Sequence, residues 1–334
     1  MTLPDLWFLI IAFLWTGFFV LEGFDFGVGM LHKVVGRTDT EQRVAINAIG
    51  PFWDGNEVWL IVAGAAMFAA FPGWYATLFS GLYLALLLVL VALMARGASF
   101  EFGDKVRSPR WRRTWTWATT LSSGALPLLL GIGLGGMVAG FPIDSDGEYS
   151  GGVIDMFTAY GVWTGLTLLS LSVLHGATFL ALKTDGPVRA DARRVAGRAG
   201  LVTVAVAGVF LLWTQFAYGS GPTWATAALA AVALVGALVG NARGREGWAF
   251  LATAVTIVLA TATLFANLYP YVLPSTVDPS FGLTVDNASS TPYTLRIMTW
   301  VAVGFTPIVL LYQGWTYWVF RKRLTVTDIP TGSS

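Results

Sequence analysis

The hydrophobic residues of this chain are gathered in long runs that contain few charged positions. A helix needs about twenty such residues to cross the hydrocarbon core of a membrane. Several runs reach that length, and short segments rich in glycine, proline and polar residues separate them. The pattern predicts nine membrane-spanning helices, at about residues 6–31, 48–71, 75–95, 114–140, 155–181, 198–218, 222–241, 247–269 and 295–320.

The composition agrees with one integral membrane domain. Hydrophobic residues make up 55% of the 334 positions and charged residues only 12%, whereas about a quarter of an average soluble domain is charged. The mean hydropathy is +0.67. The chain has no cysteine, which excludes disulfides, iron–sulfur clusters and thiolate metal sites. We therefore expect residues 1–334 to form a single all-α polytopic membrane domain.

The basic residues are confined to alternate loops. Of the 20 lysines and arginines, all except Arg296 fall in such loops or in the tail, and the intervening loops carry acids such as Asp144 and Asp278 instead. Basic loops remain on the cytoplasmic side of a membrane. The sequence therefore predicts an N-terminus outside the cell and a C-terminus in the cytoplasm. The basic segments are 32–48, 96–113, 182–198, 242–246 and the tail after residue 320.

Two pairs of acidic residues interrupt the first two hydrophobic runs. Glu22 and Asp25 are three residues apart, as are Asp54 and Glu57, so each pair shares one helix face. The predicted orientation places both pairs in the cytoplasmic half of the membrane, with Glu101 at a similar depth. Ionisable groups at this depth are costly and by default mark a functional site. Because a row of carboxyl groups open to one side is what a proton path requires, these five acids are candidate proton carriers.

Each acid also has a structural explanation. A buried polar pair that ties two helices together would account for Glu22, Asp54 and Glu57. For Asp25 and Glu101, which lie close to the membrane interface, snorkelling or a salt bridge to a nearby basic residue would suffice. Both kinds of explanation remain open at the level of the sequence.

The two histidines and three glycines bear on the same region. Because His32 and His175 are the only histidines, this chain alone could not hold several bis-ligated haems. A lone histidine in an apolar stretch, such as His175, is more often a hydrogen-bonded packing residue than a metal ligand, and we favour packing. Gly23, Gly27 and Gly29 lie beside the first acid pair and predict close contact with another helix.

The segment before the second hydrophobic run predicts a helix start and a kink. Thr38 and Glu41 have the spacing of a capping box, which begins a helix on the cytoplasmic side. We expect that helix to continue into the second span, with Pro51 kinking it just before Asp54.

Four motifs resemble subunit II of the cytochrome bd quinol oxidases. The resemblance extends over essentially the whole chain, and the first two motifs are the specific ones. It implies a subunit of a terminal oxidase in the aerobic respiratory chain, located in the bacterial plasma membrane. The implied fold has nine transmembrane helices, which we expect to form two four-helix bundles plus one additional helix. The motifs are EGFDFGVGML at 22–31, PFWDGNEVWL at 51–60, FAAFP at 68–72 and MTWV at 298–301.

The resemblance also implies partners, cofactors and site residues. In that family a larger subunit I holds haem b and haem d, and the complex oxidises quinol and reduces O₂ to water. Subunit II has no haem of its own, supports assembly and delivers protons. By their places in the motifs, Asp25 and Asp54 resemble proton-path carboxylates, as does Glu101, where some members have aspartate. Some members hold a structural quinone in this subunit, and small accessory subunits occur.

Two other functions would also place acids at membrane depth. One is a proton-coupled secondary transporter, but no pair of Gly/Pro-broken spans recurs in two halves, and both acid pairs lie within the first sixty residues. The other is a purely structural partner whose acids are locked in helix pairing. The main interpretation is the haem-free subunit of an electrogenic quinol oxidase, in contact with membrane lipid and with no nucleic-acid partner.

Overall fold

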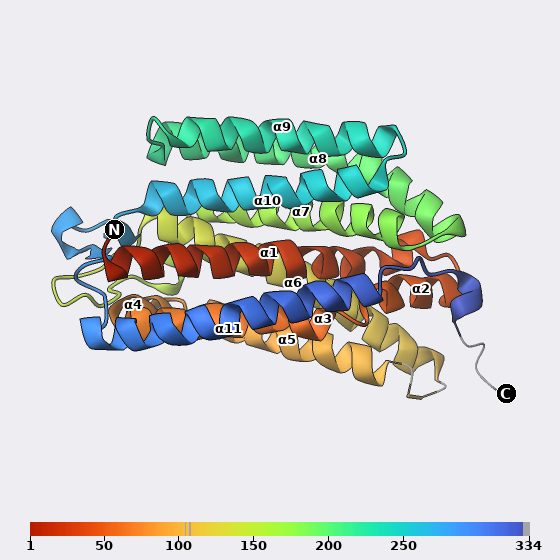
Figure 1. Ribbon diagram of the computed structural model, residues 1–334, viewed down its shortest axis with the longest axis horizontal. Helices are drawn as coiled ribbons and strands as arrows, with labels where there is room; N and C mark the ends of the chain where they lie inside the picture. Colours follow the sequence, from red (N-terminus) through yellow and green to blue (C-terminus); the bar gives the residue numbers. More distant parts are fainter. Residues whose placement is uncertain (104, 107, 330–334) are drawn as a thin grey trace.

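Long helices that run side by side make up most of the computed structural model, which describes residues 1–103, 105–106 and 108–329 (Figure 1). The longest of them include α1 (Leu3–Val35) and α8 (Gly186–Tyr218). The expectation of an all-helical membrane protein is confirmed. The other helices are α2 (Asp39–Ile49), α3 (Trp53–Ala70), α4 (Pro72–Gly81), α5 (Tyr83–Phe102), α6 (Pro109–Ala139), α7 (Ala159–Lys183), α9 (Thr223–Ala242), α10 (Glu246–Leu268) and α11 (Pro292–Val319), with short 3₁₀ turns at Val153–Met156, Pro279–Phe281 and Val326–Asp328.

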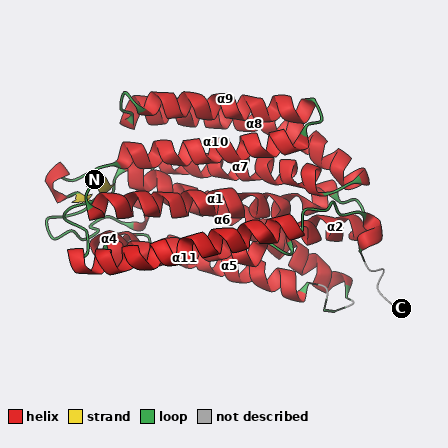
Figure 2. Ribbon diagram, viewed as in Figure 1, coloured by secondary structure: helices red, strands yellow, loops and turns green. Residues whose placement is uncertain are grey.

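The helices are stacked in pairs around α1. In Figure 1 the outermost pair on one side is α8 and α9, followed by α7 and α10, then α1 and α6, with α3, α5 and α11 on the opposite side. The small strands β1 (Tyr271–Leu273) and β2 (Leu283–Thr284) pair antiparallel near the N-terminal end of the bundle (Figure 2). The fold therefore has a helical body whose only described sheet lies among the loops at one end.

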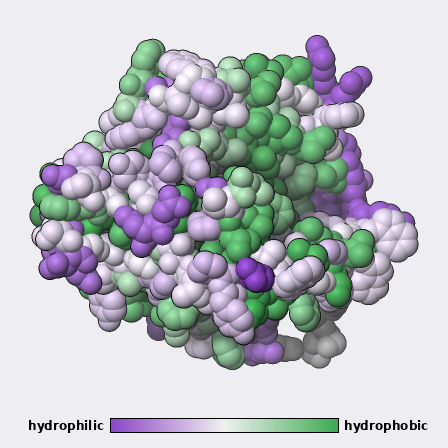
Figure 3. Space-filling view, turned by 60° about the vertical axis from the view of Figure 1, so that its left-hand side comes forward, coloured by the Kyte–Doolittle hydropathy of each residue, from purple (hydrophilic) through white to green (hydrophobic). Residues whose placement is uncertain are grey.

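Eight of the described helices are long and apolar enough to cross a membrane: α1 and α5 to α11. The second predicted span corresponds to α3, an 18-residue helix that is not among the eight, since Asp54, Asn56 and Glu57 make its first turns polar. It packs against α1 and contacts α11. In Figure 3 hydrophobic side chains gather along the flank of the molecule, and hydrophilic ones gather towards its ends. This distribution suits a protein whose middle lies in lipid.

The chain between the first two spans is broken rather than kinked. The capping box is confirmed: Thr38 accepts a hydrogen bond from the amide of Glu41, whose carboxylate accepts one from the amide of Thr38. The helix it begins, α2, ends at Ile49, and α3 begins at Trp53. The expected continuous helix is therefore wrong. Proline lacks an amide hydrogen and its ring opposes the preceding turn, and here Pro51 ends the helix instead of bending it.

Two further expectations differ from the observed helices. The run at 75–95 is divided between α4 and α5, which are separated at Leu82. A side chain at Gly81 would meet the ring of Tyr149 at 2.8 Å, so the chain bends where a loop packs closely on it. Arg96, which the charge pattern predicts at the start of a cytoplasmic loop, instead lies inside α5 and is fully buried. Hydropathy ends a span at the first strong charge, whereas the helix continues to Phe102.

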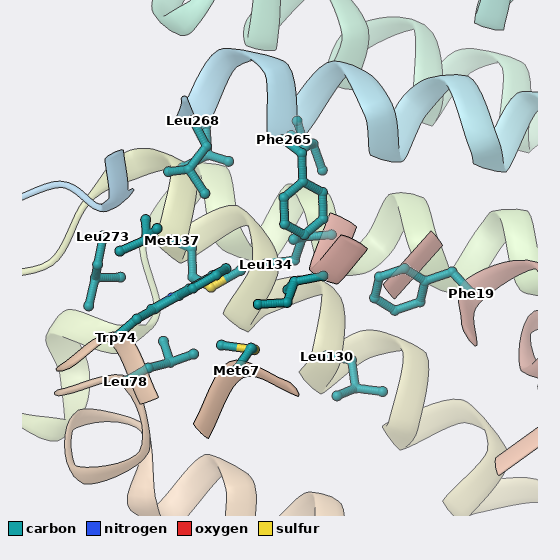
Figure 4. Packing of buried hydrophobic residues seen from close by; sticks show 14 of the residues in the cluster. Phe19, Met67, Trp74, Leu78, Leu130, Leu134, Met137, Phe265, Leu268 and Leu273 are labelled. Carbon is teal, nitrogen blue, oxygen red and sulfur yellow. The ribbon is translucent and has the colours of Figure 1, made fainter. Parts of the chain in front are cut away.

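The larger of the two clusters of buried apolar residues includes the end of the bundle that carries the N-terminus. Figure 4 shows Trp74 from α4 lying flat among Met67, Met137 and Leu268, which come from three other helices. The Trp74 ring is fully buried. It meets the ring of Phe71 edge-on, with the two ring centroids 5.9 Å apart. Burying side chains of this size stabilises a fold by about 1.5–3 kcal/mol each in water. The core thus clamps α4 and the adjoining loops onto α1, α6 and α10.

Helices α1 and α7 meet backbone to backbone. A Cβ atom at Gly27 would lie 2.0 Å from the carbonyl oxygen of Ser172, and one at Gly176 would lie 2.5 Å from backbone atoms of Gly27. At Gly29 an added Cβ would strike Ser123 of α6 at 2.1 Å. The predicted close helix contact is confirmed for these two α1 glycines, and it is made within the chain.

Replacing Gly27 by alanine is expected to lower the melting temperature of the purified protein and the yield of assembled material. The added methyl group has no space, and overpacking of this kind costs about 1–3 kcal/mol. Gly23→Ala is the matched control, because its Cβ would meet nothing closer than 3.7 Å. Thermal unfolding in detergent compares the two. Equal melting temperatures for both variants would contradict the contact.

Candidate functional site

A buried ion pair lies in the half of the bundle that carries α2. Arg96 of α5 contacts a carboxylate oxygen of Glu22 on α1 directly, and its Nη1 lies 3.4 Å from Oε2 of Glu57 on α3. The guanidinium carbon is 5.1 Å from the ring centroids of both Phe26 and Phe100. Arg96 and Glu22 are fully buried, and Glu57 is partly exposed. A buried charge is stable only with a partner. Arg96 therefore links α5 to α1 through Glu22 and to α3 through Glu57.

A chain of hydrogen bonds extends from the same region to the last helix. Asp25, one turn after Glu22 and also fully buried, accepts a hydrogen bond of 2.7 Å from the side-chain amide of Asn56. The Asn56 carbonyl oxygen accepts two more, from the amide of Gln313 at 2.9 Å and from the hydroxyl of Tyr317 at 3.0 Å. Trp59 then donates to the Gln313 carbonyl oxygen at 2.9 Å. These bonds tie α1, α3 and α11 together.

Two of the predicted site residues lie outside this buried group. Asp54, in the first turn of α3, is exposed and lines a groove of about 970 Å³ between α3 and α11. Glu101 is exposed near the end of α5. Neither carboxylate has a hydrogen-bond or ion-pair partner among the residues described. The structure thus gathers Glu22, Asp25 and Glu57, leaves Asp54 on the adjacent groove and places Glu101 apart.

Both histidines are engaged within the chain. The Nε2 atom of His175 lies 3.1 Å from the carbonyl oxygen of Val20, and Nδ1 lies 2.6 Å from the hydroxyl of Thr253. Its ring stacks on Phe250 at a centroid distance of 4.6 Å. The Nδ1 atom of His32 lies 2.8 Å from a backbone carbonyl oxygen. Within residues 1–103, 105–106 and 108–329, no group of three or more histidines and acids is arranged to hold a metal ion.

Sequence reasoning misses two members of the site and misplaces a third. It places Arg96 in a loop as a possible salt-bridge partner of Asp25 or Glu101, whereas Arg96 is buried and pairs with Glu22 and Glu57. Gln313 is the only amide in the last apolar run, and at that depth it needed a partner. Tyr317, one turn later, gave no such signal, because tyrosines near span ends are ordinary interface anchors.

Comparisons with known proteins agree on one family. The chain matches the family described as cytochrome bd terminal oxidase subunit II over residues 3–320. It is 40% identical over 329 residues to cytochrome bd ubiquinol oxidase subunit 2 of Bacillus subtilis (strain 168), with 97% of each chain covered. It is 35% identical over 362 residues to cytochrome bd-I ubiquinol oxidase subunit 2 of Escherichia coli (strain K12), covering 97% of this chain and 96% of that one.

A solved structure shows the same fold. The structure of bd oxidase from Geobacillus thermodenitrificans aligns with a TM-score of 0.76 at 20% identity, covering 96% of this chain and 100% of that chain. The resemblance seen in the four sequence motifs is therefore confirmed by relatives that span nearly the whole chain. The protein belongs to the family of cytochrome bd terminal oxidase subunit II.

Proposed function

We propose that this chain is the haem-free subunit of an electrogenic quinol:oxygen oxidoreductase. It supports a haem-bearing subunit I and delivers protons from the cytoplasm for the reduction of O₂ to water. The observation that carries the proposal is the buried group of Glu22, Asp25 and Glu57, which lies beside the groove that Asp54 lines. Carboxyl groups at this depth are costly, and their presence by default indicates a functional site.

Unsatisfied polar atoms in this group support proton transfer. Among the described residues, one oxygen of Asp25, the Glu22 oxygen that does not contact Arg96, and Nε and Nη2 of Arg96 are buried without a hydrogen-bond partner. Buried polar atoms normally have a hydrogen-bond partner, and ordered water fills that role where no protein group does. Carboxylates linked by water can pass protons from one to the next. The buried atoms without partners can make the hydrogen bonds that such a chain of water molecules needs.

A partner subunit on the side of α3, α5 and α11 accounts for the exposed apolar surface there. Only Leu295 of α11 is buried, while Trp300 and Leu311 are 73% and 75% exposed. Lipid could cover these side chains, but it gives no partner to the carboxylate of Asp54 on the same side. Subunit I is the partner that would receive protons there.

The location of the cofactors is proposed from membership of the family. Haem b and haem d belong in the partner subunit, because this chain has only two histidines and one of them, His175, uses both ring nitrogens in hydrogen bonds. A structural quinone, if this chain holds one, fits an apolar groove of about 770 Å³ that Trp15, Phe19 and Leu130 help to line. Membership of the family does not favour the transporter alternative. The loop charges support a C-terminus in the cytoplasm.

Replacing Asp54 by asparagine tests the proposal. The change keeps the side-chain volume and removes the titratable proton, so we expect normal haem content of the complex with quinol oxidase turnover lowered about 100-fold. Asp54→Glu should retain part of the activity. A purely structural role predicts no loss of turnover in either variant, because the exposed Asp54 carboxylate makes no hydrogen bond or ion pair with the described residues that either change could break.

Oxygen consumption per haem is the measurement for both variants. Asp286→Asn, which neutralises an exposed loop acid, is the matched control and should leave turnover unchanged. Wild-type turnover in Asp54→Asn would remove this residue from the proton path.

A further inference from the structure

A separate polar cavity lies at the end of the bundle where α1 and α5 finish and α2 and α6 begin. Its volume is about 380 Å³, and residues from all four helices line it. The charged members of the lining are Lys33, Asp39, Arg43, Arg112 and Arg113. No member of the buried acid group belongs to this lining, so the cavity is distinct from the candidate proton path.

Among the described lining residues, positive charge exceeds negative charge. Asp39 is the one carboxylate in this described lining, and it is paired with Arg112 at 3.0 Å. The ammonium group of Lys33 lies 4.5 Å from the ring centroid of Trp117, and neither Lys33 nor Arg113 has a carboxylate partner among the described residues. Two exposed cations without carboxylate partners repel one another, and an anion bound between them removes that repulsion.

Helix ends add to the same potential. Asp39 is the first residue of α2, and Pro109, which also lines the cavity, is the first residue of α6. The N-terminus of a helix carries partial positive charge, which favours phosphate and carboxylate groups. The amides of Glu41 and Trp111 already donate to the capping side chains Thr38 and Ser108, so the contribution here is the helix charge rather than free amides. Arg112 and Arg113 lie in the opening turns of α6, so side-chain and backbone charge act at one place.

The rest of the lining combines polar side chains, such as Gln42, Asn47 and Thr116, with the apolar side chains of Ile46, Phe100 and Trp115. Trp117, 46% exposed beside Lys33, is a side chain of the kind found at headgroup level in membranes. A ligand that matches this cavity therefore has an anionic head for the basic side chains and an apolar part for the aromatic ones.

We propose that this cavity binds the phosphoryl group of an anionic phospholipid. Arginine and lysine bind phosphate oxygens through charge-assisted hydrogen bonds. Basic pockets between membrane helices are suited to acidic lipid headgroups. Free inorganic phosphate offers the same oxygens without the acyl chains, so the two sources share the site chemistry and differ in whether the apolar lining contributes.

The test uses the purified protein in the assembly in which it is extracted, delipidated and then titrated with phosphatidylglycerol in nanodiscs or with inorganic phosphate. We compare wild type with the double variant Lys33→Gln/Arg113→Gln. The matched control is Arg198→Gln/Arg243→Gln, which removes the same charge from exposed positions outside the cavity. Each basic side chain near an acidic headgroup contributes a factor of about five, so the cavity variant should bind phosphatidylglycerol about 30-fold more weakly.

The outcomes separate the explanations. Weakened lipid binding in the cavity variant alone, with neutral phosphatidylcholine bound equally by all three proteins, supports the proposal. Binding of inorganic phosphate that the cavity variant loses, without any preference for the lipid, assigns the same site to free phosphate and overturns the lipid as its occupant. Equal losses in the cavity variant and the control overturn the site itself.

Discussion

Replacing Arg96 by leucine is expected to abolish the accumulation of folded protein. The change leaves Glu22, which is fully buried, without its counter-ion. Removing one partner of a buried pair costs about 3–5 kcal/mol, which is a large share of the 5–15 kcal/mol that stabilises a typical domain. The measurement is the yield of detergent-extracted protein, with Arg243→Leu as a control for loss of an exposed arginine.

A double variant distinguishes the effect of an unpaired buried charge from a general loss of packing. If the fault in Arg96→Leu is the unpaired carboxylate, the double change Arg96→Leu/Glu22→Leu should restore much of the yield, because a hydrophobic pair can replace a buried ion pair at little cost. Turnover should remain low, since one carboxyl of the proton path is gone. Wild-type yield in the single variant would show that the ion pair does not hold the helices.

Replacing Asp25 by asparagine is expected to leave assembly intact and to reduce turnover about 100-fold. The asparagine carbonyl oxygen can still accept the hydrogen bond that Asn56 donates, so the link from α1 to α3 and α11 persists. What is lost is the proton that this buried side chain can hold. Oxygen consumption and proton uptake, each measured per haem, report the change.

A comparison with Gln313→Leu identifies the cause. That variant breaks the hydrogen bonds to Asn56 and Trp59 but removes no titratable group. It should loosen α11 and lower the melting temperature more than Asp25→Asn does. If both variants lose stability and activity in the same proportion, Asp25 acts through structure and the proton-path role is contradicted.

Local patterns were sufficient for much of the fold. Runs of apolar residues predicted the long helices, because a helix in lipid must hide its backbone polar groups along its whole length. The Thr38–Glu41 capping box and the close contact at Gly27 were also predictable, since each depends on residue types at fixed spacing.

The remaining features depend on residues that are distant in sequence. Nothing near Pro51 distinguishes a kinked helix from two separate ones, because the result depends on what packs around the break. The glycines of α1 could equally have faced another subunit, and only the fold shows that they face α7 and α6. The bond from Gln313 to Asn56 joins residues 257 positions apart, and a single sequence offers no signal for such a pairing.

The contact between Gly27 and Gly176 fixes the separation of α1 and α7 within a narrow range. Side chains at most helix crossings can change rotamer, and the separation of the helices fluctuates with them. At this crossing backbone meets backbone, so there are no rotamers to exchange. The distance between α1 and α7 is therefore set by covalent geometry and hard-sphere contact alone. Glu22 and Asp25 lie within two turns of Gly27, so their positions also vary little. Substitutions on the lipid-facing surface of the bundle should not change this.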